Sequence, residues 1–383
     1  MEKISNNCSG CGACISLCRH GAVRLVLNNL GEEVAVIDQD KCIGCGLCKK
    51  KCPQESDVKG IRPSTCFASW TKNQYDYHTT SSGGIATLLC RRIIKMGGVV
   101  YGAAYLPTQD VTHIRIENEK ELDKIKGSKY VQSTIVQCYK LIKQDLEEGR
   151  MVLFIGTPCQ IAGIEAVYGE NEKLITVDLV CHGTPPREYL KEYITSMVPS
   201  NGKDTKVAFR EKKYWLSIYQ EGSCIYHQRY NRDPYFLSFM NNEIFRENCY
   251  SCKYANVKRV SDITLGDFWG IKKLDTRLSM PEHVSCVLIN TLKGETLFSS
   301  VKEECYSEEM LIEDAVKGNW NLHSTSMRPK LKDDFNRGYI NGGFMNGLKE
   351  TAVENRIARN KIRDVIMTPY RIFRYGKNYR NLL

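Results

Sequence analysis

The sequence predicts a small α+β domain at the N-terminus, followed by a larger α/β domain with a mixed sheet. Two observations predict the small domain: two equal runs of four cysteines, and a strand–turn–strand pattern between them. One observation predicts the large domain, namely helical and strand patterns that alternate from residue 80 onward. A chain of 383 residues is long enough for the small domain and for one large or two ordinary domains with hydrophobic cores.

The eight N-terminal cysteines have a spacing that is specific for iron–sulfur clusters. Both runs have the pattern C-x2-C-x2-C-x3-C, with which bacterial ferredoxins hold two 4Fe-4S clusters, and the fourth cysteine of each run ligates the other cluster. The expected ligands of the first cluster are Cys8, Cys11, Cys14 and Cys52. The expected ligands of the second cluster are Cys18, Cys42, Cys45 and Cys48.

Two alternatives to this interpretation are weaker. Zinc sites use four ligands in two pairs, and disulfides need an oxidising compartment that nothing in the sequence indicates. Between the runs, residues 22–27 and 33–38 have strand patterns around an Asn-Asn-Leu-Gly turn. We therefore predict a ferredoxin-like two-cluster domain over residues 1–60 and a linker at residues 61–63.

The large domain has a pattern of alternating helices and strands. Helices are expected over residues 85–96, 134–148 and 294–304, because each has a helical pattern and two of them end at glycine. Buried strands are expected over residues 99–105, 151–155 and 174–180, and another strand over residues 285–291. Residues 205–210 and 216–220 are expected to form strands of a second sheet.

Four further cysteines are candidates for a third metal site. Cys159 and Cys181 each follow a predicted buried strand, and Cys249 and Cys252 form a C-x2-C pair. Four thiolates from three loops could hold a 4Fe-4S cluster or a zinc ion. Alternatively, Cys159 and Cys181 are small buried apolar residues. The remaining six cysteines are interpreted as core or incidental residues: Cys66, Cys90, Cys138, Cys224, Cys286 and Cys305.

Two segments have groups that suit a phosphate-bearing cofactor. Ser82, Gly83 and Gly84 precede a predicted helix, whose free N–H groups and dipole favour phosphate. The second segment offers cations, a hydroxyl, an amide and an aromatic ring, on Lys126, Ser128, Lys129, Tyr130 and Gln132. A dinucleotide or flavin site uses such groups. The alternatives are an ordinary glycine-rich N-cap and a solvated turn.

The charge pattern limits the possible partners. The net charge is +10, and residues 351–383 contain eight Lys or Arg and two acidic residues. We therefore predict a basic, partly helical extension over residues 326–383, which suits an acidic redox partner, a weak contact with an anionic membrane surface, or simply solvent. No nucleic-acid-binding module is recognisable, so we expect no nucleic acid partner.

The sequence also predicts a soluble, cytoplasmic protein. The longest apolar runs, at residues 99–105 and 151–155, are far too short to span a membrane, and the chain opens with polar residues rather than a signal segment. Eighteen cysteines without an export signal indicate a reducing compartment and metal ligation.

Seven motifs between residues 66 and 320 resemble one known family. They are SSGGIATLL, GGVVYGAAY, KGSKYVQS, FIGTPCQIAG, VDLVCHGTPP, NCYSCKYA and DITLGDFWG. In their order they resemble the family of beta subunits of coenzyme F-420 (deazaflavin) hydrogenases and dehydrogenases, some members of which carry an N-terminal two-cluster ferredoxin domain. The resemblance implies that residues 61–325 form an FAD-binding α/β catalytic domain with a mixed sheet. It also implies a cluster within that domain, which favours Cys159, Cys181, Cys249 and Cys252 as its ligands.

The expected function follows from the clusters and from this resemblance. We predict an FAD and iron–sulfur oxidoreductase that takes electrons from a low-potential donor, such as ferredoxin or another redox protein. The electrons would pass through two 4Fe-4S clusters, and a third, to FAD and on to a deazaflavin-like or other small-molecule acceptor. The alternative is an electron-carrier or docking subunit of a larger redox complex. The sequence identifies neither catalytic residues nor the oligomeric state.

Overall fold

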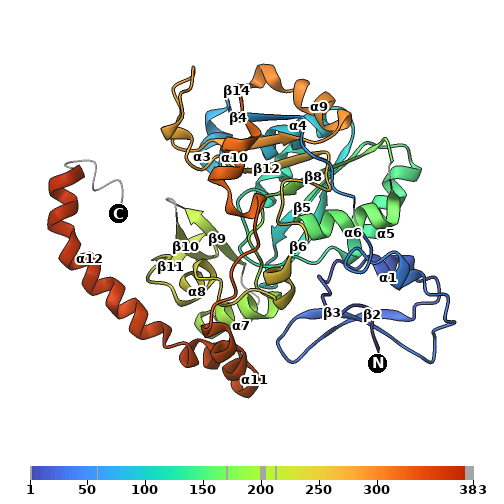
Figure 1. Cartoon of the computed structure of the whole chain (residues 1–383), viewed down its shortest axis with the longest axis horizontal. Coiled ribbons are helices and arrows are strands. Elements are labelled where there is room, and N and C mark those ends of the chain that lie inside the picture. The colour runs from blue at the N-terminus through green and yellow to red at the C-terminus, as the bar shows by residue number, and fades with distance from the viewer. Residues whose placement is uncertain (1, 58, 170, 199–203, 212–213, 376–383) are drawn as a thin grey trace.

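The computed structural model describes residues 2–57, 59–169, 171–198, 204–211 and 214–375. They form three sheets, a small one at the N-terminus, a large central one, and a second small one beside it (Figure 1). The predicted α+β N-terminal region and the mixed sheet of the following α/β region are confirmed. No described helix combines the length and the apolar character needed to cross a membrane.

The N-terminal domain is a three-stranded antiparallel sheet with two short helices. The strand order is β1-β3-β2, and its elements are β1 (Glu2–Lys3), α1 (Ala13–Leu17), β2 (Val23–Leu27), β3 (Glu33–Ile37) and α2 (Leu47–Lys50). Asn28 closes the predicted hairpin, because its side-chain oxygen accepts hydrogen bonds from the N–H groups of Leu30 and Glu32, at 2.9 and 3.0 Å. Both helices begin after a glycine with positive φ, Gly12 and Gly46, which lies between two cysteines.

The central sheet has eight strands in the order β14-β4-β13-β12-β8-β7-β5-β6. Four neighbouring strands, β5, β7, β8 and β12, run parallel, and the others are antiparallel to their neighbours. The bounds are β4 (Thr65–Thr71), β5 (Val99–Tyr105), β6 (Val111–Ile116), β7 (Val152–Gly156), β8 (Leu174–Leu179), β12 (Ile263–Asp267), β13 (Ser285–Ile289) and β14 (Cys305–Met310).

Helices cover both faces of the central sheet. On one face, α4 (Ile85–Lys95) and α9 (Leu292–Ser299) share a core with the sheet, and on the other face α5 (Val136–Glu147) and α6 (Pro158–Tyr168) do so. Shorter elements complete this region: α3 (Gln74–Thr79), α10 (Ile312–Gly318) and the 3-10 turns η1 (Glu119–Lys124), η2 (Glu247–Ser251), η3 (Ile271–Lys273), η4 (Lys302–Glu304) and η5 (Trp320–Leu322). The helix predicted for residues 294–304 is shorter than expected, because α9 ends at Ser299 and the chain turns into η4.

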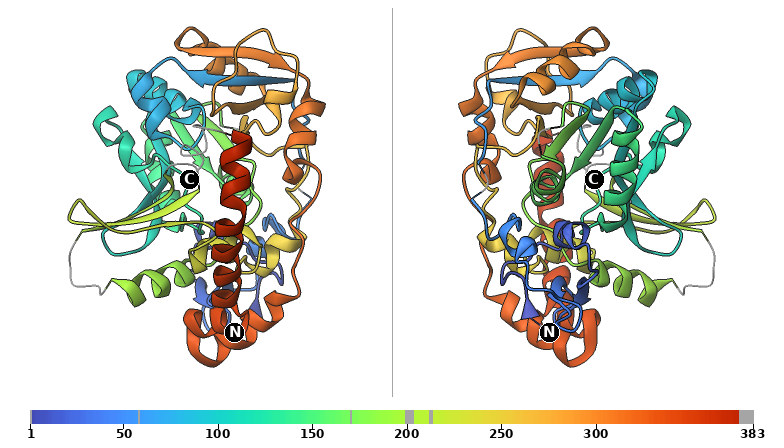
Figure 2. Two further views of the ribbon diagram at one scale, coloured as in Figure 1. Left: turned by 90° about the vertical axis from the view of Figure 1, so that its left-hand side faces the viewer. Right: turned by 90° about the vertical axis from the view of Figure 1, so that its right-hand side faces the viewer.

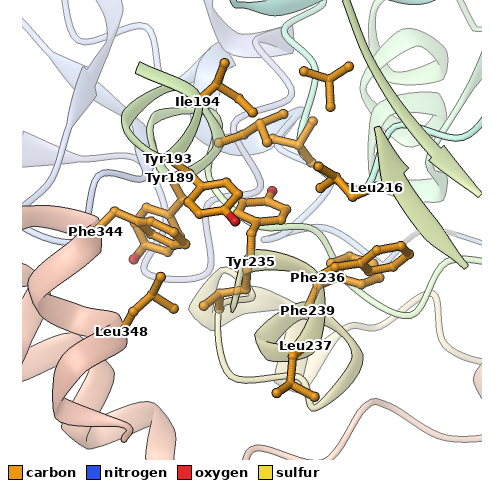
Figure 3. Packing of buried hydrophobic residues seen from close by; sticks show 14 of the residues in the cluster. Tyr189, Tyr193, Ile194, Leu216, Tyr235, Phe236, Leu237, Phe239, Phe344 and Leu348 are labelled. Carbon is orange, nitrogen blue, oxygen red and sulfur yellow. The ribbon is translucent and has the colours of Figure 1, made fainter. Parts of the chain in front are cut away.

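The second small sheet packs against the C-terminal helices. Its order is β11-β10-β9, with β9 (Thr205–Glu211), β10 (Trp215–Gln220) and β11 (Ser223–Arg229). The helices around it are α7 (Arg187–Met197), α8 (Pro234–Met240), α11 (Leu331–Glu350) and α12 (Val353–Tyr375). Figure 3 shows Phe344 and Leu348 of α11 in one aromatic core with Tyr189, Tyr193 and Tyr235. The first part of the predicted C-terminal extension therefore belongs to this core.

Candidate functional site

The cysteines of the N-terminal domain lie in two groups. The pKa of the Cys11 thiol is raised to about 12, mainly by burial and in smaller part by the thiols of Cys8 and Cys52. The pKa of Cys14 is likewise raised by burial and by Cys11, Cys8 and Cys52, with the smallest contribution from Cys48. Burial also raises the pKa of Cys48, with smaller contributions from Cys18 and Cys42. Cys52 thus lies beside the first run and Cys18 beside the second, as an exchange of fourth ligands requires.

Main-chain N–H groups point at several of these sulfur atoms. Gly10 and Ala35 donate to the sulfur of Cys8, Gly44 donates to that of Cys42, and Ala22 donates to that of Cys18, each over 3.4 Å. Hydrogen bonds to ligand sulfurs stabilise negative charge and tune a cluster's reduction potential. The two groups differ in exposure. Cys11 and Cys14 are buried, whereas Cys45 is exposed.

The four later cysteines line one small cavity. Cys159 is the second residue of α6, which follows β7, and Cys181 follows β8, the parallel neighbour of β7. Cys249 lies in η2 and Cys252 directly after it, and both reach the same cavity. Burial raises the pKa of Cys181 well above its ordinary value, and Cys249, Cys159 and Cys252 raise it further. In the described part of the chain, no three His, Cys, Asp or Glu side chains lie close enough to bind a single metal ion.

The other six cysteines lie apart from these groups. Five of them are buried: Cys66, Cys90, Cys138, Cys286 and Cys305. Cys224 is exposed on β11.

We call three sets of cysteines the inner group (Cys8, Cys11, Cys14 and Cys52), the outer group (Cys18, Cys42, Cys45 and Cys48) and the third group (Cys159, Cys181, Cys249 and Cys252). The inner group packs on α6 through Cys11. The hydroxyl of Tyr139 donates to the carbonyl of Cys11 over 2.9 Å, and Gly163 of α6 faces the side chain of Cys11. A Cβ atom on Gly163 would lie 2.9 Å from the Cys11 Cβ, closer than side chains pack. The thiol of Cys159 also contributes to the raised pKa of Cys11. The inner group and the third group of cysteines are therefore neighbours.

Arg246 joins the two domains beside these thiols. It is 1% exposed. Its guanidinium donates to the side-chain oxygen of Gln132 at 2.7 Å and to the carbonyls of Glu33 and Cys8 at 2.9 and 3.0 Å. The residue was not among the candidates, because a single arginine has no sequence signal that separates it from a surface arginine.

A larger cavity of about 460 Å³ opens on the other side of the third cysteine group. It lies at the carboxyl ends of β7, β8 and β12, where open α/β sheets bind ligands. Cys159, Cys181 and Cys249 line both cavities. The cavity is within the range of about 300–1,000 Å³ that is typical of cofactor sites.

Most of the residues predicted for the cofactor line this cavity. They are Ser82, Gly84, Lys126, Ser128, Lys129, Tyr130 and Gln132. Gly83 lies behind the wall instead, where its N–H donates to Ser285 and its carbonyl accepts from Thr71. A Cβ atom on Gly83 would lie 2.4 Å from the carbonyl of Ser69, so only glycine fits here.

Several of these side chains are engaged within the protein. The ammonium of Lys126 pairs with Asp76 at 2.9 Å and with Asp123 at 2.6 Å. Lys129 donates to two main-chain carbonyls, and burial lowers its pKa to about 7. Tyr130 stacks on Phe239, with ring centroids 4.5 Å apart. The phosphate and stacking roles of these side chains remain predictions.

Other polar groups of the cavity were not foreseen. His113 is buried between the hydroxyl of Ser133 and the carbonyl of Ile155, at 3.0 and 2.8 Å, and burial lowers its pKa to about 4. Arg210 pairs with Asp267 over 2.7 Å. Arg210 has φ +65 and lies where the pairing of β9 with β10 shifts, so a β-bulge sets its direction. The sequence did not indicate that these residues belong to the cavity, because each is an isolated polar residue within a strand pattern.

The cavity walls fit a phosphate-bearing cofactor. The N-terminus of α4 lines the cavity, and its N-cap Gly84 gives no side-chain cap to the first N–H groups. Such N–H groups bind anions. The buried hydroxyl of Ser9, in the first cysteine run, also lines the cavity and has no hydrogen-bond partner among the described residues. An anionic cofactor would accept hydrogen bonds from these N–H groups and from this hydroxyl.

The fold and the grouped cysteines indicate an iron–sulfur redox protein, and comparison with known proteins shows which proteins the chain resembles. Residues 7–56 and 34–122 match models described as "4Fe-4S dicluster domain". Residues 149–315 match the model described as the C terminus of the beta subunit of coenzyme F420 hydrogenase/dehydrogenase. The resemblance drawn from the motifs is confirmed.

Two characterised proteins are similar over most of the chain. A subunit of the F(420)H(2) dehydrogenase of Methanosarcina mazei is 22% identical over 78% of this chain and 83% of that protein. Coenzyme F420-dependent sulfite reductase of Methanocaldococcus jannaschii is 27% identical over 78% of this chain, which spans 46% of that protein. Among solved structures, the F420-reducing [NiFe] hydrogenase complex from Methanosarcina barkeri contains a chain with a TM-score of 0.46 and 17% identity, over 76% of this chain and 98% of that one.

Proposed function

We propose that this protein is an iron–sulfur flavoprotein oxidoreductase. It takes electrons from a low-potential donor such as ferredoxin and delivers them to a deazaflavin-like or other small acceptor. In this proposal, the two groups of ferredoxin cysteines and the group formed by Cys159, Cys181, Cys249 and Cys252 each hold a 4Fe-4S cluster, and the large cavity holds FAD. When bound, the clusters carry single electrons, and the flavin couples two such transfers to a two-electron reduction.

One observation carries the proposal: the three cysteine groups follow one another from the surface to the cavity. The outer group includes exposed Cys45, the inner group packs on α6 through Cys11 beside Cys159, and Cys159, Cys181 and Cys249 of the third group line the large cavity. Redox centres must lie close together for rapid transfer, and this order supports a relay that ends at a ligand site.

The surface around the outer group supports a protein donor. Ile43 and Leu47 are exposed on either side of Cys45, and Lys50 and Lys51 follow on the same exposed segment. An exposed apolar surface with cations beside it suits contact with an acidic redox protein, because complementary charge raises the rate of association.

The residues of the cavity have separate tasks in this proposal. The N-terminus of α4 would hold the phosphate groups of the cofactor. His113 is neutral at physiological pH, and Nε2 carries its proton when it donates to the carbonyl of Ile155. The Arg210–Asp267 pair and the exposed ring of Trp269 line the cavity and would contact the acceptor.

An electron-carrying subunit of a larger complex is the second candidate. The similar Methanosarcina mazei protein is named as a subunit of a dehydrogenase, and the exposed cysteine loop could serve a neighbouring chain as well as a donor. The two candidates differ in one respect. The oxidoreductase, purified alone, would reduce a deazaflavin with electrons from reduced ferredoxin, whereas the carrier would need its partner chains.

The iron and flavin content of anaerobically purified protein tests the proposal. We expect one FAD and about twelve irons, four in each cubane. Cys252→Ala should lower the iron content to about eight without changing the N-terminal clusters, and Cys224→Ala, at an exposed cysteine outside all three groups, should leave it unchanged. Protein without flavin would contradict the proposed cavity ligand. Equal iron content in the two variants would contradict the third cluster.

A further inference from the structure

Helix α12 exposes a stripe of apolar side chains. Ile362, Val365, Ile366 and Phe373 are 60%, 73%, 68% and 89% exposed, and Pro369 is exposed as well. Their spacing of three, four and seven residues places all five on one side of the helix. We call these five residues the α12 stripe. Large apolar side chains that gather on a surface in this way indicate a contact with something else.

The opposite side of α12 fixes the direction of the stripe. Buried Asp364 accepts a hydrogen bond from Asn231 at 3.3 Å and pairs with Arg232 at 3.4 Å. About two turns earlier on this side, Arg356 pairs with Glu243 at 2.8 Å. Because the polar side is held by the body of the protein, the stripe points outward. Figure 1 and the left view of Figure 2 both show α12 at the outside of the molecule.

Cations flank the stripe. Neighbouring positions on a helix differ by about 100°, so Lys361 and Arg363 lie on the two sides of Ile362. Arg359 is one turn before Arg363, and all three are exposed. Among the described residues, none of the three forms an ion pair with a carboxylate. From residue 357 to residue 375 the sequence has one acidic residue, Asp364, which is buried.

The charges decide between the possible occupants. A second copy of this chain, packed stripe to stripe, would bring the same cations together, and like charges across an interface are unfavourable. The cores of protein interfaces are also depleted in lysine. An anionic lipid surface suits both features, because its interior accepts the apolar side chains and its headgroups accept the cations.

We propose that α12 binds the surface of an anionic membrane. The helix lies in the plane of the surface, with the α12 stripe inserted between headgroups and Arg359, Lys361 and Arg363 beside the lipid phosphates. This contact holds the protein on the membrane without a spanning segment. This membrane contact does not depend on the redox chemistry proposed above, so an experiment can contradict either proposal without contradicting the other.

Co-sedimentation of the full-length protein with lipid vesicles tests the proposal. We expect the protein to sediment with vesicles of phosphatidylglycerol and phosphatidylcholine, and to remain in solution with phosphatidylcholine alone. Ile366→Asp should lower the binding constant at least about tenfold, because burial of one isoleucine is lost. Lys361→Ala and Arg363→Ala should each lower it about fivefold at low salt, and much less at high salt.

Two controls keep the test specific. Leu292→Asp changes an apolar residue on α9 that is 80% exposed but lies outside the stripe, and it should bind like the wild type. The visible absorption of the clusters should be the same in all variants, which shows that they are folded. The proposal is overturned if the wild type ignores anionic vesicles, or if Ile366→Asp binds as well as Leu292→Asp. It is also overturned if ultracentrifugation finds a dimer that Ile366→Asp dissociates.

Discussion

From the contact of Arg246 with the N-terminal domain, we predict that replacing this residue lowers the stability of the protein. In the wild type, this buried guanidinium satisfies the carbonyls of Cys8 and Glu33 and the side-chain oxygen of Gln132. Arg246→Met keeps an apolar stem of similar length but removes every donor. The buried side-chain oxygen of Gln132 and the two partly buried carbonyls then lose their partners at the junction between the domains.

The size of the effect follows from these three hydrogen bonds. A buried acceptor left without a partner costs about 1–3 kcal/mol. The three acceptors of Arg246, two of which are only partly buried and can be relieved by relaxation or by water, should together cost about 3–5 kcal/mol. Since domains are stable by only about 5–15 kcal/mol, the variant should lose a large part of its stability.

An anaerobic urea titration measures this loss through the visible absorption of the clusters and the fluorescence of tryptophan. We expect the midpoint for Arg246→Met to fall by about 1 M or more. Arg62→Met is the matched control, because Arg62 forms an exposed ion pair with Glu313 at 3.5 Å, and such pairs contribute about 0–1 kcal/mol. Equal midpoints for the two variants would refute the reasoning.

Two further predictions concern the domain contact and pH. Gly163→Val should push Cys11 and Tyr139 away from α6. In stopped-flow reduction by ferredoxin, electron transfer beyond the N-terminal clusters should then be slower, while the iron content stays unchanged. An unaltered rate of transfer would contradict the contact. Burial lowers the pKa of His113 to about 4, below its unfolded value of about 6.5, so the unfolded chain binds the proton first as the pH falls. The free energy of unfolding should therefore fall between about pH 6.5 and about pH 4, by about 1.4 kcal/mol at about pH 5.5, and His113→Gln should lack this part of the pH dependence in urea titrations. An identical pH dependence in wild type and variant would show that His113 does not titrate as described.

The sequence predicted best what local spacing determines. The two cysteine runs lie in short loops, and their spacing alone predicted that Cys52 lies beside the first run and Cys18 beside the second, while ligation itself stays a prediction. The apolar run at residues 99–105 coincides with β5, because a strand buried on both faces is apolar throughout. The placement of Cys159 and Cys181 followed from the rule for ends of parallel strands.

The sequence did not predict features that depend on distant partners. The partners of Arg246 lie more than one hundred residues away, at Cys8, Glu33 and Gln132, and no local pattern connects them. In α11, the backbone at Gly342 and Gly343 is not helical, with φ of −174° and 75°. This kink interrupts the helical period, so the core positions on either side of it do not form the pattern of one amphipathic helix.

The position of β4 has a consequence for the order of folding. This strand follows the ferredoxin domain directly, yet it lies between β13 and β14, which are made more than two hundred residues later. The sheet of the ferredoxin domain pairs only strands within residues 2–37 and can form during synthesis, while β4 must wait for residues 285–310. Until then the waiting strand presents unpaired edges, which favour aggregation. The protein should therefore depend on chaperones during synthesis more strongly than its finished structure would suggest.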